Sequence, residues 1–322
     1  MKGLTEHEII RVLTNQFYGR PGVPLGFDDD VSAIPLSSEN WIIVKTDMLV
    51  GSTDVPPGMT VRQAARKAVV ATVSDFAAKG VRPRALLVSL GLPAPAKKTT
   101  VQGIARGLSQ AAREYNCKII GGDTNQADDL IIDVIGIGLA NPKKLVRRSG
   151  AQPGDVVAVT GLFGKSSAGL RILMSRNKKN KASYPSLVRA ALWPRARLQE
   201  GLALARSDGI NSSIDSSDGL ALSLHQLTET SNVGISLDTI PIDPAVRRFA
   251  GEFRFSAIDL ALYGGEEYEL VLTISPGRFL ALQNRVQSLI KIGTVEPANH
   301  GLTAKIGGKL FQVEDRGWEH FT

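Results

Sequence analysis

Aspartates stand at the expected ends of several strands and helices in this sequence. Asp28-Asp29-Asp30 follows a stretch rich in proline and glycine, and Thr46-Asp47 is expected to end a strand. Gly121-Gly122-Asp123-Thr124 follows another strand, and Asp215-Ser216-Ser217-Asp218-Gly219 leads from a strand into a helix. Carboxylates gathered in one site repel each other unless hard cations neutralise them, and Mg²⁺ takes oxygen ligands while bridging phosphates. Taken singly, however, each aspartate is more typical of a cap or a turn.

Asp75 is harder to explain as a cap. It lies in Val69–Ala78, an otherwise apolar segment of an expected helix rich in alanine and valine. A carboxylate buried on such a helix is costly unless it is paired or hydrogen-bonded. The sequence therefore predicts a partner for Asp75 if the helix is buried.

A glycine-rich turn follows the expected strand Val156–Gly161. Gly164-Lys165-Ser166 resembles the end of a P-loop, but a P-loop has four residues between its glycines, whereas Gly161 and Gly164 enclose only Leu162 and Phe163. The shorter turn cannot wrap backbone amides around a phosphate in the same way. The sequence therefore argues against a P-loop and leaves a helix N-terminus that can meet an anion.

Two further segments have both a structural and a functional explanation. Gly264-Gly265-Glu266-Glu267 places acidic residues between a turn and an apolar strand, where they either solvate the strand entry or line a site. Trp318, near the C-terminus, either fills the core or offers its ring to a cationic ligand.

Composition excludes several classes of function. The chain has 322 residues, 38 Lys and Arg against 31 Asp and Glu, and a formal net charge of +7. Its single cysteine, Cys117, and its scattered histidines exclude a disulfide framework and a Cys- or His-rich zinc site. No stretch of about 18 apolar residues occurs, and the N-terminal residues lack a signal-peptide core, so we expect a cytoplasmic protein without membrane spans.

The positive charge is concentrated in short clusters: Lys143-Lys144, Arg147-Arg148 and residues 176–181. Aromatic residues make up 6% of the chain, and none interleaves with these clusters as a base-stacking surface requires. The pattern therefore argues against nucleic acid as a partner and favours a solvated loop at 176–181.

Periodicity predicts two α+β domains rather than one doubly wound sheet, because helices and strands mix without strict alternation. Capping boxes are expected at Thr5…Glu8, Thr60…Gln63 and Thr99…Gln102. Expected helices cover 4–17, 60–79, 99–115, 166–174, 194–207, 218–231 and 276–289, and expected strands cover 41–46, 85–90, 117–120, 130–139, 155–160, 234–237 and 268–273. A polar stretch at 141–153 is the expected domain boundary.

Taken in order, these segments resemble the thiamine-monophosphate kinase family, which belongs to a superfamily of ATP-using enzymes that includes aminoimidazole ribonucleotide synthetase. The resemblance covers nearly the whole chain. It rests on residues 25–30, 45–50, 74–75, 80–93, 121–124, 148–151, 161–170, 215–220, 264–270 and 317–321.

The resemblance implies an α/β (α+β), two-domain, aminoimidazole ribonucleotide synthetase-like fold. Residues 1–148 would form an N-terminal domain that binds ATP and Mg²⁺ and pairs with a second subunit into a β-barrel. Residues 149–322 would form an α/β domain that completes the active site. A homodimer is implied with it.

The resemblance also implies ATP-dependent phosphorylation of thiamine monophosphate to thiamine diphosphate, by direct in-line transfer with several Mg²⁺ ions. No general base is implied, because the acceptor phosphate is already an anion. By motif position, the implied metal ligands are Asp29, Thr46, Asp47, Asp75, Asp123, Asp215 and Asp218. The implied ATP contacts are Gly122, Asp123, Arg148 and Ser217, and the implied substrate contacts are Asp54, Glu266 and Trp318.

The sequence departs from the family pattern at four places. Asp28 replaces a common glycine, which leaves open which of the three neighbouring aspartates binds metal. Asp54 replaces a histidine that contacts substrate, and Glu267 replaces an aspartate. An adenine contact cannot be carried over, because its position is occupied by Ala105.

Two other functions remain as alternatives. Aminoimidazole ribonucleotide synthetase is the alternative enzyme, and the terminus Gly317–Phe321 argues against it. A non-catalytic binder of phosphometabolites or nucleic acid, built on the same scaffold, is the alternative from another class.

Overall fold

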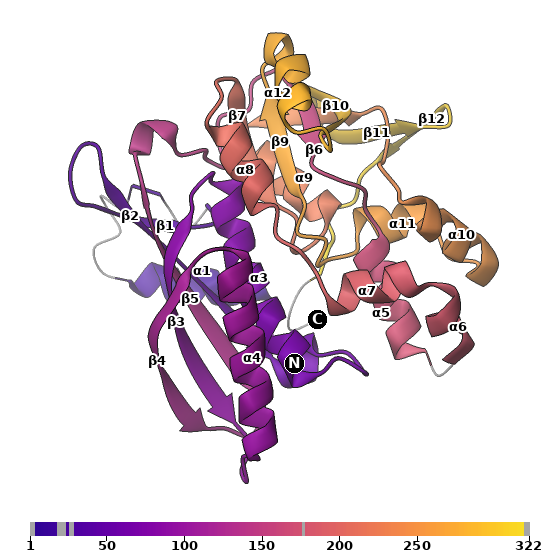
Figure 1. Ribbon diagram of the computed structural model, residues 1–322. Helices are drawn as coiled ribbons and strands as arrows, with labels where there is room; N and C mark the ends of the chain where they lie inside the picture. The colour runs from indigo at the N-terminus through magenta and orange to yellow at the C-terminus, as the bar shows by residue number, and fades with distance from the viewer. Residues whose placement is uncertain (1–3, 18–23, 26–28, 176–177, 319–322) are drawn as a thin grey trace.

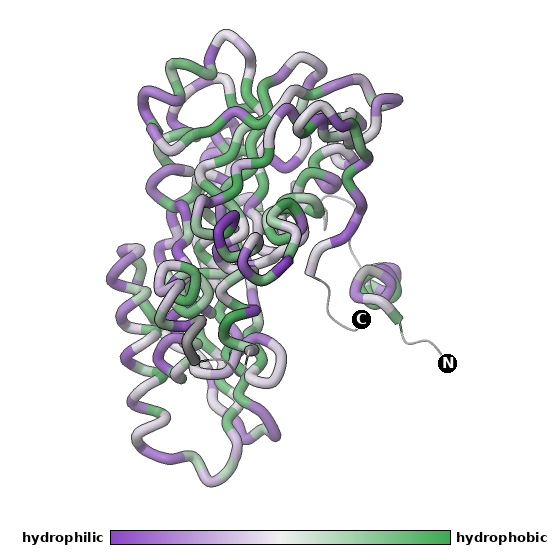
Figure 2. The backbone as a smooth tube through the Cα atoms, turned by 90° about the vertical axis from the view of Figure 1, so that its right-hand side faces the viewer, coloured by the Kyte–Doolittle hydropathy of each residue, from purple (hydrophilic) through white to green (hydrophobic). Residues whose placement is uncertain are grey.

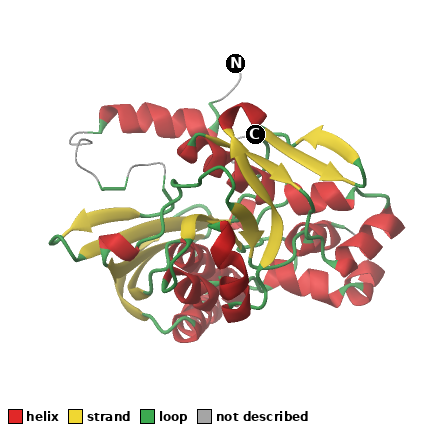
Figure 3. Ribbon diagram, turned by 90° about the horizontal axis from the view of Figure 1, so that it is seen from above, coloured by secondary structure: helices red, strands yellow, loops and turns green. Residues whose placement is uncertain are grey.

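The chain forms two β-sheets, one from residues 32–140 and one from residues 156–312, and both halves mix helices with strands (Figures 1 and 3). This is a computed structural model that describes residues 4–17, 24–25, 29–175 and 178–318. The strands are β1 Ser32–Pro35, β2 Trp41–Val50, β3 Pro83–Leu92, β4 Lys118–Gln126, β5 Ile131–Ala140, β6 Val156–Val159, β7 Ile210–Asp215, β8 Val233–Leu237, β9 Leu270–Ile274, β10 Ile290–Pro297, β11 Leu302–Ile306 and β12 Lys309–Gln312. The helices are α1 Glu6–Gln16, α2 Gly51–Asp54, α3 Val61–Ala78, α4 Lys98–Glu114, α5 Lys165–Met174, α6 Lys178–Ser183, α7 Pro185–Leu192, α8 Leu198–Ala205, α9 Leu220–Ser231, α10 Pro244–Phe253, α11 Ala257–Leu262 and α12 Phe279–Arg285, with short 3₁₀ turns at Pro142–Lys144, Pro276–Arg278 and Ala298–His300.

The first sheet has the order β1-β2-β5-β3-β4 and presents two different faces. Its pairs are antiparallel except for β3 and β4, which are parallel and joined through α4. Strand side chains alternate between the faces, and the side chains of Ile132 and Val134 are buried on the face that α3 and α4 cover (Figure 1). Their neighbours Ile135 and Ile137 point to the opposite face and are only partly buried. That face therefore keeps apolar side chains partly open to solvent.

Helix α3 is the central element of the molecule. It begins at the capping box of Thr60 and Gln63, and most of its residues are buried. The small alanine side chains of α3 let neighbouring helices approach closely. Gly201 of α8 lies so near to α3 that a Cβ added to it would be 2.1 Å from the Ala77 carbonyl oxygen. The core cluster that contains α3 draws residues from both sheets. The two halves are therefore packed around a shared helix.

The second sheet has the order β12-β11-β8-β10-β6-β9-β7. Its central strands are rich in valine and isoleucine, and Val157, Val159 and Ile235 are fully buried in a second core cluster. Hydrophobic and hydrophilic residues are interspersed along both halves, while α1 stands apart from the rest of the fold (Figure 2). No described helix is long and apolar enough to span a membrane.

The structure confirms the mixed α/β class with two sheets and the capping boxes at Thr5 and Thr60. The third capping box is wrong: α4 begins at Lys98, its N-cap residue is Lys97, and Thr99 lies inside the helix. Residues 176–177 lie outside the described part of the chain, and the basic run that follows them begins α6 rather than a loop.

Two segments, one expected to end a strand and one expected to follow a strand, lie inside strands instead. Thr46 and Asp47 are in the middle of β2, and Gly121–Thr124 lie in β4. Glycine and aspartate disfavour strands, but the ladder with β3 supplies the hydrogen bonds that extend β4 through them. The first sheet is open within the described residues, and the division at 148/149, between the last strand of one sheet and the first of the next, stays a prediction.

Candidate functional site

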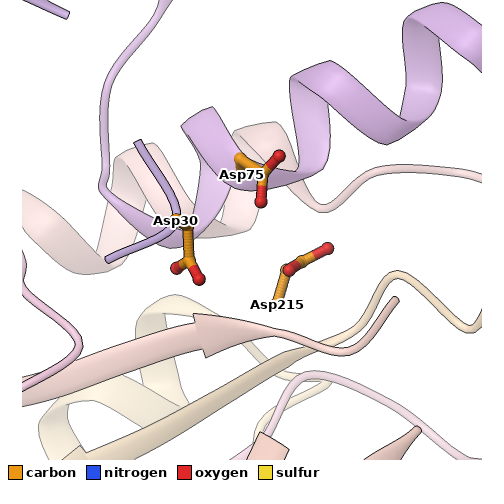
Figure 4. A group of neighbouring side chains, drawn as sticks. All are labelled: Asp30, Asp75 and Asp215. Carbon is orange, nitrogen blue, oxygen red and sulfur yellow. The ribbon is translucent and has the colours of Figure 1, made fainter. Parts of the chain in front are cut away.

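Three buried carboxylates converge where the two halves meet. Asp30 precedes β1, Asp75 is on α3 and Asp215 ends β7. Their side chains point toward one another (Figure 4), and one oxygen from each lies within 4.8 Å of the others. The three residues are 4%, 6% and 5% exposed, respectively. This group is called the carboxylate cluster below.

Burial and mutual repulsion make the cluster costly to ionise. Burial raises the pKa of Asp75 well above its ordinary value, and nearby Asp47 and Asp215 add to the effect. Burial, with Asp30 nearby, raises the pKa of Asp215 to about 7. In addition, Oδ2 of Asp47 is buried and has no hydrogen-bond partner among the described residues. A set of oxygen donors with uncompensated negative charge fits Mg²⁺.

Two basic side chains stabilise the ionised form of Asp30. Lys79 Nζ lies 2.8 Å from Asp30 Oδ2 and 2.6 Å from Asp29 Oδ1, and the Arg148 guanidinium pairs with Asp30 Oδ1. Although burial opposes them, Lys79 and Arg148 lower the pKa of Asp30. Asp29 turns away toward Lys79 and the backbone N–H of Arg148. The sequence leaves open which of the neighbouring aspartates binds metal, and the structure places Asp30 rather than Asp29 in the cluster.

Lys45 lies on the opposite side of the cluster. Its Nζ is 3.0 Å from Asp75 Oδ2 and 3.4 Å from Asp47 Oδ1. Because residues two apart on a strand point to the same face, Lys45 and Asp47 of β2 both face α3. The structure thus brings the predicted residues Asp47, Asp75 and Asp215 into one neighbourhood.

Helix α3 lines this neighbourhood with one strip of its surface. Lys67, Ala71, Asp75 and Lys79 are spaced four residues apart, so they follow one another along the helix. Lys67 is 3% exposed and pairs with the carboxylate of Glu266, while its ammonium also donates to the Asp54 carbonyl oxygen at 2.9 Å. The helix therefore connects the cluster to the Glu266 segment.

A small pocket of about 110 Å³ adjoins the cluster on the side of Lys67. All three predicted substrate residues, Asp54, Glu266 and Trp318, line it. The Asp54 carboxylate accepts a hydrogen bond from the Val50 N–H at 2.7 Å, so this carboxylate also holds the end of β2.

A larger cleft of about 930 Å³ adjoins the cluster on the other side, between α1 and the segment around Arg148. Arg148, Lys45 and Asp30 line it, and its size is that of a nucleotide-sized ligand site. Trp318 and Asp218 line both the cleft and the small pocket. A third, polar pocket between them is lined by the carboxylate cluster and by Ser217.

Trp318 is not a plug of the core. It is 46% exposed, and its backbone N–H donates to the Asp218 carbonyl oxygen at 2.9 Å. Its position between cleft and pocket favours the ligand-stacking explanation. Glu319, His320 and Phe321 of the same motif lie outside the described residues, as does Asp28.

Within one chain, three predicted residues are not brought to the cluster. The Thr46 hydroxyl points to the other face of the sheet and donates to Asp133 Oδ1 at 2.7 Å. Gly122 of β4 is aligned with Val88 of β3. Val88 is aligned with Val134 of β5, which is aligned in turn with Asp47 of β2, so three strand spacings separate Gly122 from Asp47. At about 4.8 Å between strands, Gly122 and its neighbour Asp123 lie about 14 Å from Asp47.

The turn that resembles a P-loop has its own hydrogen-bond acceptor within the chain. The Glu267 carboxylate accepts a hydrogen bond from the Ser166 N–H at 2.9 Å, at the N-terminus of α5. Burial raises the pKa of Glu267 to about 8. The Ser166 N–H at this helix N-terminus therefore has its hydrogen-bond acceptor within the chain, and the helix N-terminus does not line the cleft. This agrees with the spacing of Gly161 and Gly164, which argued against a P-loop.

Three charged residues at the site were not predicted from the sequence: Lys45, Lys67 and Lys79. Lys67 and Lys79 carried the same signal as Asp75, a charge on an apolar helix. No comparable sequence signal marked Lys45, because its partner Asp75 is distant along the chain.

Comparisons with known proteins show which proteins the chain resembles. Residues 28–140 match the family described as "AIR synthase related protein, N-terminal domain". The chain is 38% identical to the thiamine-monophosphate kinase of Pyrococcus abyssi, over 98% of this chain and 96% of that protein. It is 35% identical to the thiamine-monophosphate kinase of Nitrosopumilus maritimus, over the full length of both. A solved structure, "AaThiL complexed with AMPPCP and TMP", is 27% identical and superposes with a TM-score of 0.85, covering 98% of this chain and 97% of that one.

The contact of Glu267 with α5 predicts a pH-dependent stability. The pKa of Glu267 is about 8 in the folded protein and about 4.3 in an unfolded chain, so between these values only the folded protein holds the proton. Stability is then greatest at low pH and falls as the pH rises through this window. Relative to Glu267→Gln, we expect the wild-type free energy of unfolding to fall by up to about 1.4 kcal/mol per pH unit from pH 5 to 8.

Urea unfolding at several pH values measures this difference. The exposed Glu39 offers a matched control, since Glu39→Gln should leave the pH dependence as in the wild type. Parallel curves for the wild type and Glu267→Gln would show that Glu267 is ionised in the folded protein.

Proposed function

Because the chain belongs to the thiamine-monophosphate kinase family, we propose that it transfers the terminal phosphoryl group of ATP to thiamine monophosphate. One observation carries the proposal: the large cleft and the small pocket lie on either side of the carboxylate cluster and share Asp218 and Trp318. This arrangement suits two anionic substrates that meet at one point. The related structure that contains AMPPCP and TMP holds this pair of ligands together.

The reaction needs no general base. An oxygen of the acceptor phosphate attacks the γ-phosphorus, the bond to the β–γ bridging oxygen breaks, and ADP leaves with that electron pair. Both substrates are anions at neutral pH, so the main task of the protein is to position them and to balance their charge. When bound, Mg²⁺ supplies charge neutralisation and orientation of the phosphates.

The residues that we propose as metal ligands are the carboxylates that gather at the cluster and line its pockets. They are Asp30, Asp75, Asp215 and Asp47, together with Asp218, which lines all three pockets. Asp29 is a weaker candidate, because its carboxylate lies outside the cluster and turns toward Lys79 and the N–H of Arg148.

Substrate contacts follow from the lining of each pocket. We propose that Arg148 clamps the phosphates of ATP in the large cleft, and that Ser217 contacts the same phosphates. In the small pocket, the exposed ring of Trp318 suits the flat, cationic thiamine ring system, and Glu266 adds a negative charge.

A homodimer with a closed barrel accounts for the remaining residues. The open face of the first sheet carries Ile135, Ile137 and the 55% exposed Leu139. β1 pairs with β2 only at residues 41–44, so within the described residues no strand pairs with the edge of β2 from residue 45 to 49 or with the outer edge of β4. A second copy that adds its β4 beside this edge would bury the open face and remove both edges.

Such pairing would complete the site across the dimer. Thr46 and Asp123 point to the same face of the sheet, because Asp123 is aligned with Asp133 through Ser89 and the Thr46 hydroxyl donates to the Asp133 carboxylate. The partner's Asp123 and Gly122 would then lie beside Thr46 and Asp47. We therefore propose that these two residues act in the site of the other subunit, and that the chain divides into domains 1–148 and 149–322.

The first prediction concerns the reaction itself. We expect thiamine diphosphate and ADP in equal amounts from thiamine monophosphate, ATP and Mg²⁺, and no product without Mg²⁺. Asp47→Asn should lower turnover by at least about 100-fold, because it removes a carboxylate that faces the cluster. Chromatography of the products measures both.

Asp238→Asn, an exposed change of the same kind, serves as the control and should retain wild-type turnover. Near wild-type turnover of Asp47→Asn would remove Asp47 from the site. A folded wild type that binds ATP and makes no thiamine diphosphate would overturn the proposed acceptor.

The second prediction tests the contribution of the partner subunit. Asp75→Asn and Asp123→Asn should each be inactive as homodimers. In a mixed dimer of the two variants, one site combines an intact Asp75 with the partner's intact Asp123. We therefore expect about half of the wild-type activity per mixed dimer.

Co-expression with two different affinity tags isolates the mixed dimers for the assay. If Asp123 acted within its own chain, both sites of a mixed dimer would carry a lesion and no activity would appear. A monomeric wild type in light scattering would likewise contradict the proposed dimer.

A further inference from the structure

Lys45 places a fixed positive charge among carboxylates that we propose as metal ligands. Its ammonium lies 3.0 Å from Asp75 Oδ2 and 3.4 Å from Asp47 Oδ1. These are ion-pair distances, so the ammonium uses the same oxygens that a divalent cation would use. The side chain is 26% exposed and lines both the large cleft and the polar pocket of the cluster.

Comparison with Lys79 separates a structural lysine from one that faces the site. Lys79 is fully buried, and its ammonium contacts Asp29, Asp30 and the Ser213 carbonyl oxygen at 2.6 to 2.8 Å. Three acceptors satisfy its three N–H donors. Within the described ranges the Lys45 ammonium contacts two acceptors, which leaves one donor on the side of the cleft.

The backbone fixes Lys45 in this position. Lys45 and Asp47 extend from the same face of β2, which is held in register by β5 on one side. Asp75 extends toward them from α3. The ammonium is therefore held between a strand and a helix that both belong to the first half of the molecule.

The positive charge of the Lys45 ammonium limits where a metal ion can bind in the cluster. An ammonium and a divalent cation about 4 Å apart would repel strongly in a buried site. The oxygens of Asp75 and Asp47 that face Lys45 are thus closed to a metal ion while the ammonium stays in place. The remaining oxygens, toward Asp30 and Asp215, stay available.

We propose that Lys45 is a built-in cation that occupies one cation position of the carboxylate cluster, so that the wild type takes up one divalent ion fewer than its carboxylates would otherwise hold. The proposal rests on the proposed function in one respect: it assumes that divalent ions enter the cluster when nucleotide binds. It gives a role to a residue to which the family resemblance assigns none.

The number of bound ions tests the proposal without turnover. Equilibrium dialysis with Mn²⁺ and AMPPCP, a non-hydrolysable ATP analogue, gives the number of ions per chain. We expect about one additional Mn²⁺ per chain in Lys45→Met and in Lys45→Thr, because both variants free the oxygens of Asp75 and Asp47. Lys45→Arg keeps the charge and should bind as many ions as the wild type.

Lys305→Met is the matched control, since it removes an exposed positive charge on β11 and should leave the count unchanged. Thermal unfolding with and without Mn²⁺ identifies any variant that fails to fold, and Lys45→Met and Lys45→Thr should gain more stability from Mn²⁺ than the wild type does. Equal, non-zero counts in the wild type and both neutral variants would overturn the role of Lys45 alone. A wild type that binds AMPPCP and no Mn²⁺ would instead overturn the metal-dependent function.

Discussion

The repulsion among Asp30, Asp75 and Asp215 is the constraint on which the rest of the structure depends. Three carboxylates with oxygens within 4.8 Å of one another cannot all be ionised in a buried site unless positive charge balances them. Part of this balance is built into the chain, since Lys79 and Arg148 hold Asp30 ionised. The raised pKa values of Asp75 and Asp215 show that the balance is incomplete. Bound divalent cations would supply the positive charge that is missing.

The same cluster ties the two halves of the chain together. The Ser74 hydroxyl donates to Asp215 Oδ2 at 2.7 Å, and the Lys79 ammonium donates to the Ser213 carbonyl oxygen at 2.8 Å. Both contacts join α3 of the first half to β7 of the second. The same contacts therefore pack the two halves against α3 and assemble the site. A substitution that weakens the contacts between α3 and β7 would disturb both.

The sequence predicts this site better than it predicts the local structure around it. Asp75 is identifiable because a charge on an apolar helix needs a partner, and the motif order led to Asp47 and Asp215. The choice between Asp29 and Asp30 depends on which carboxylate lies beside Asp75 and Asp215, and the positions of Thr46 and Asp123 depend on strand register across the sheet. Lys45 could not be predicted for the same reason, because its partner Asp75 lies on a helix that is distant in sequence. Pairing between distant segments cannot be inferred from one sequence.

Our central claim is that the buried carboxylates at the joint between the halves exist to hold divalent cations beside a nucleotide. Anomalous diffraction from crystals grown with Mn²⁺ and AMPPCP tests it most directly, because it locates the ions themselves. If these carboxylates hold divalent cations, we expect Mn²⁺ peaks within about 2.2 Å of oxygens of Asp30, Asp75 and Asp215. Crystals that contain AMPPCP in the cleft and show no Mn²⁺ peak at these three carboxylates would contradict it.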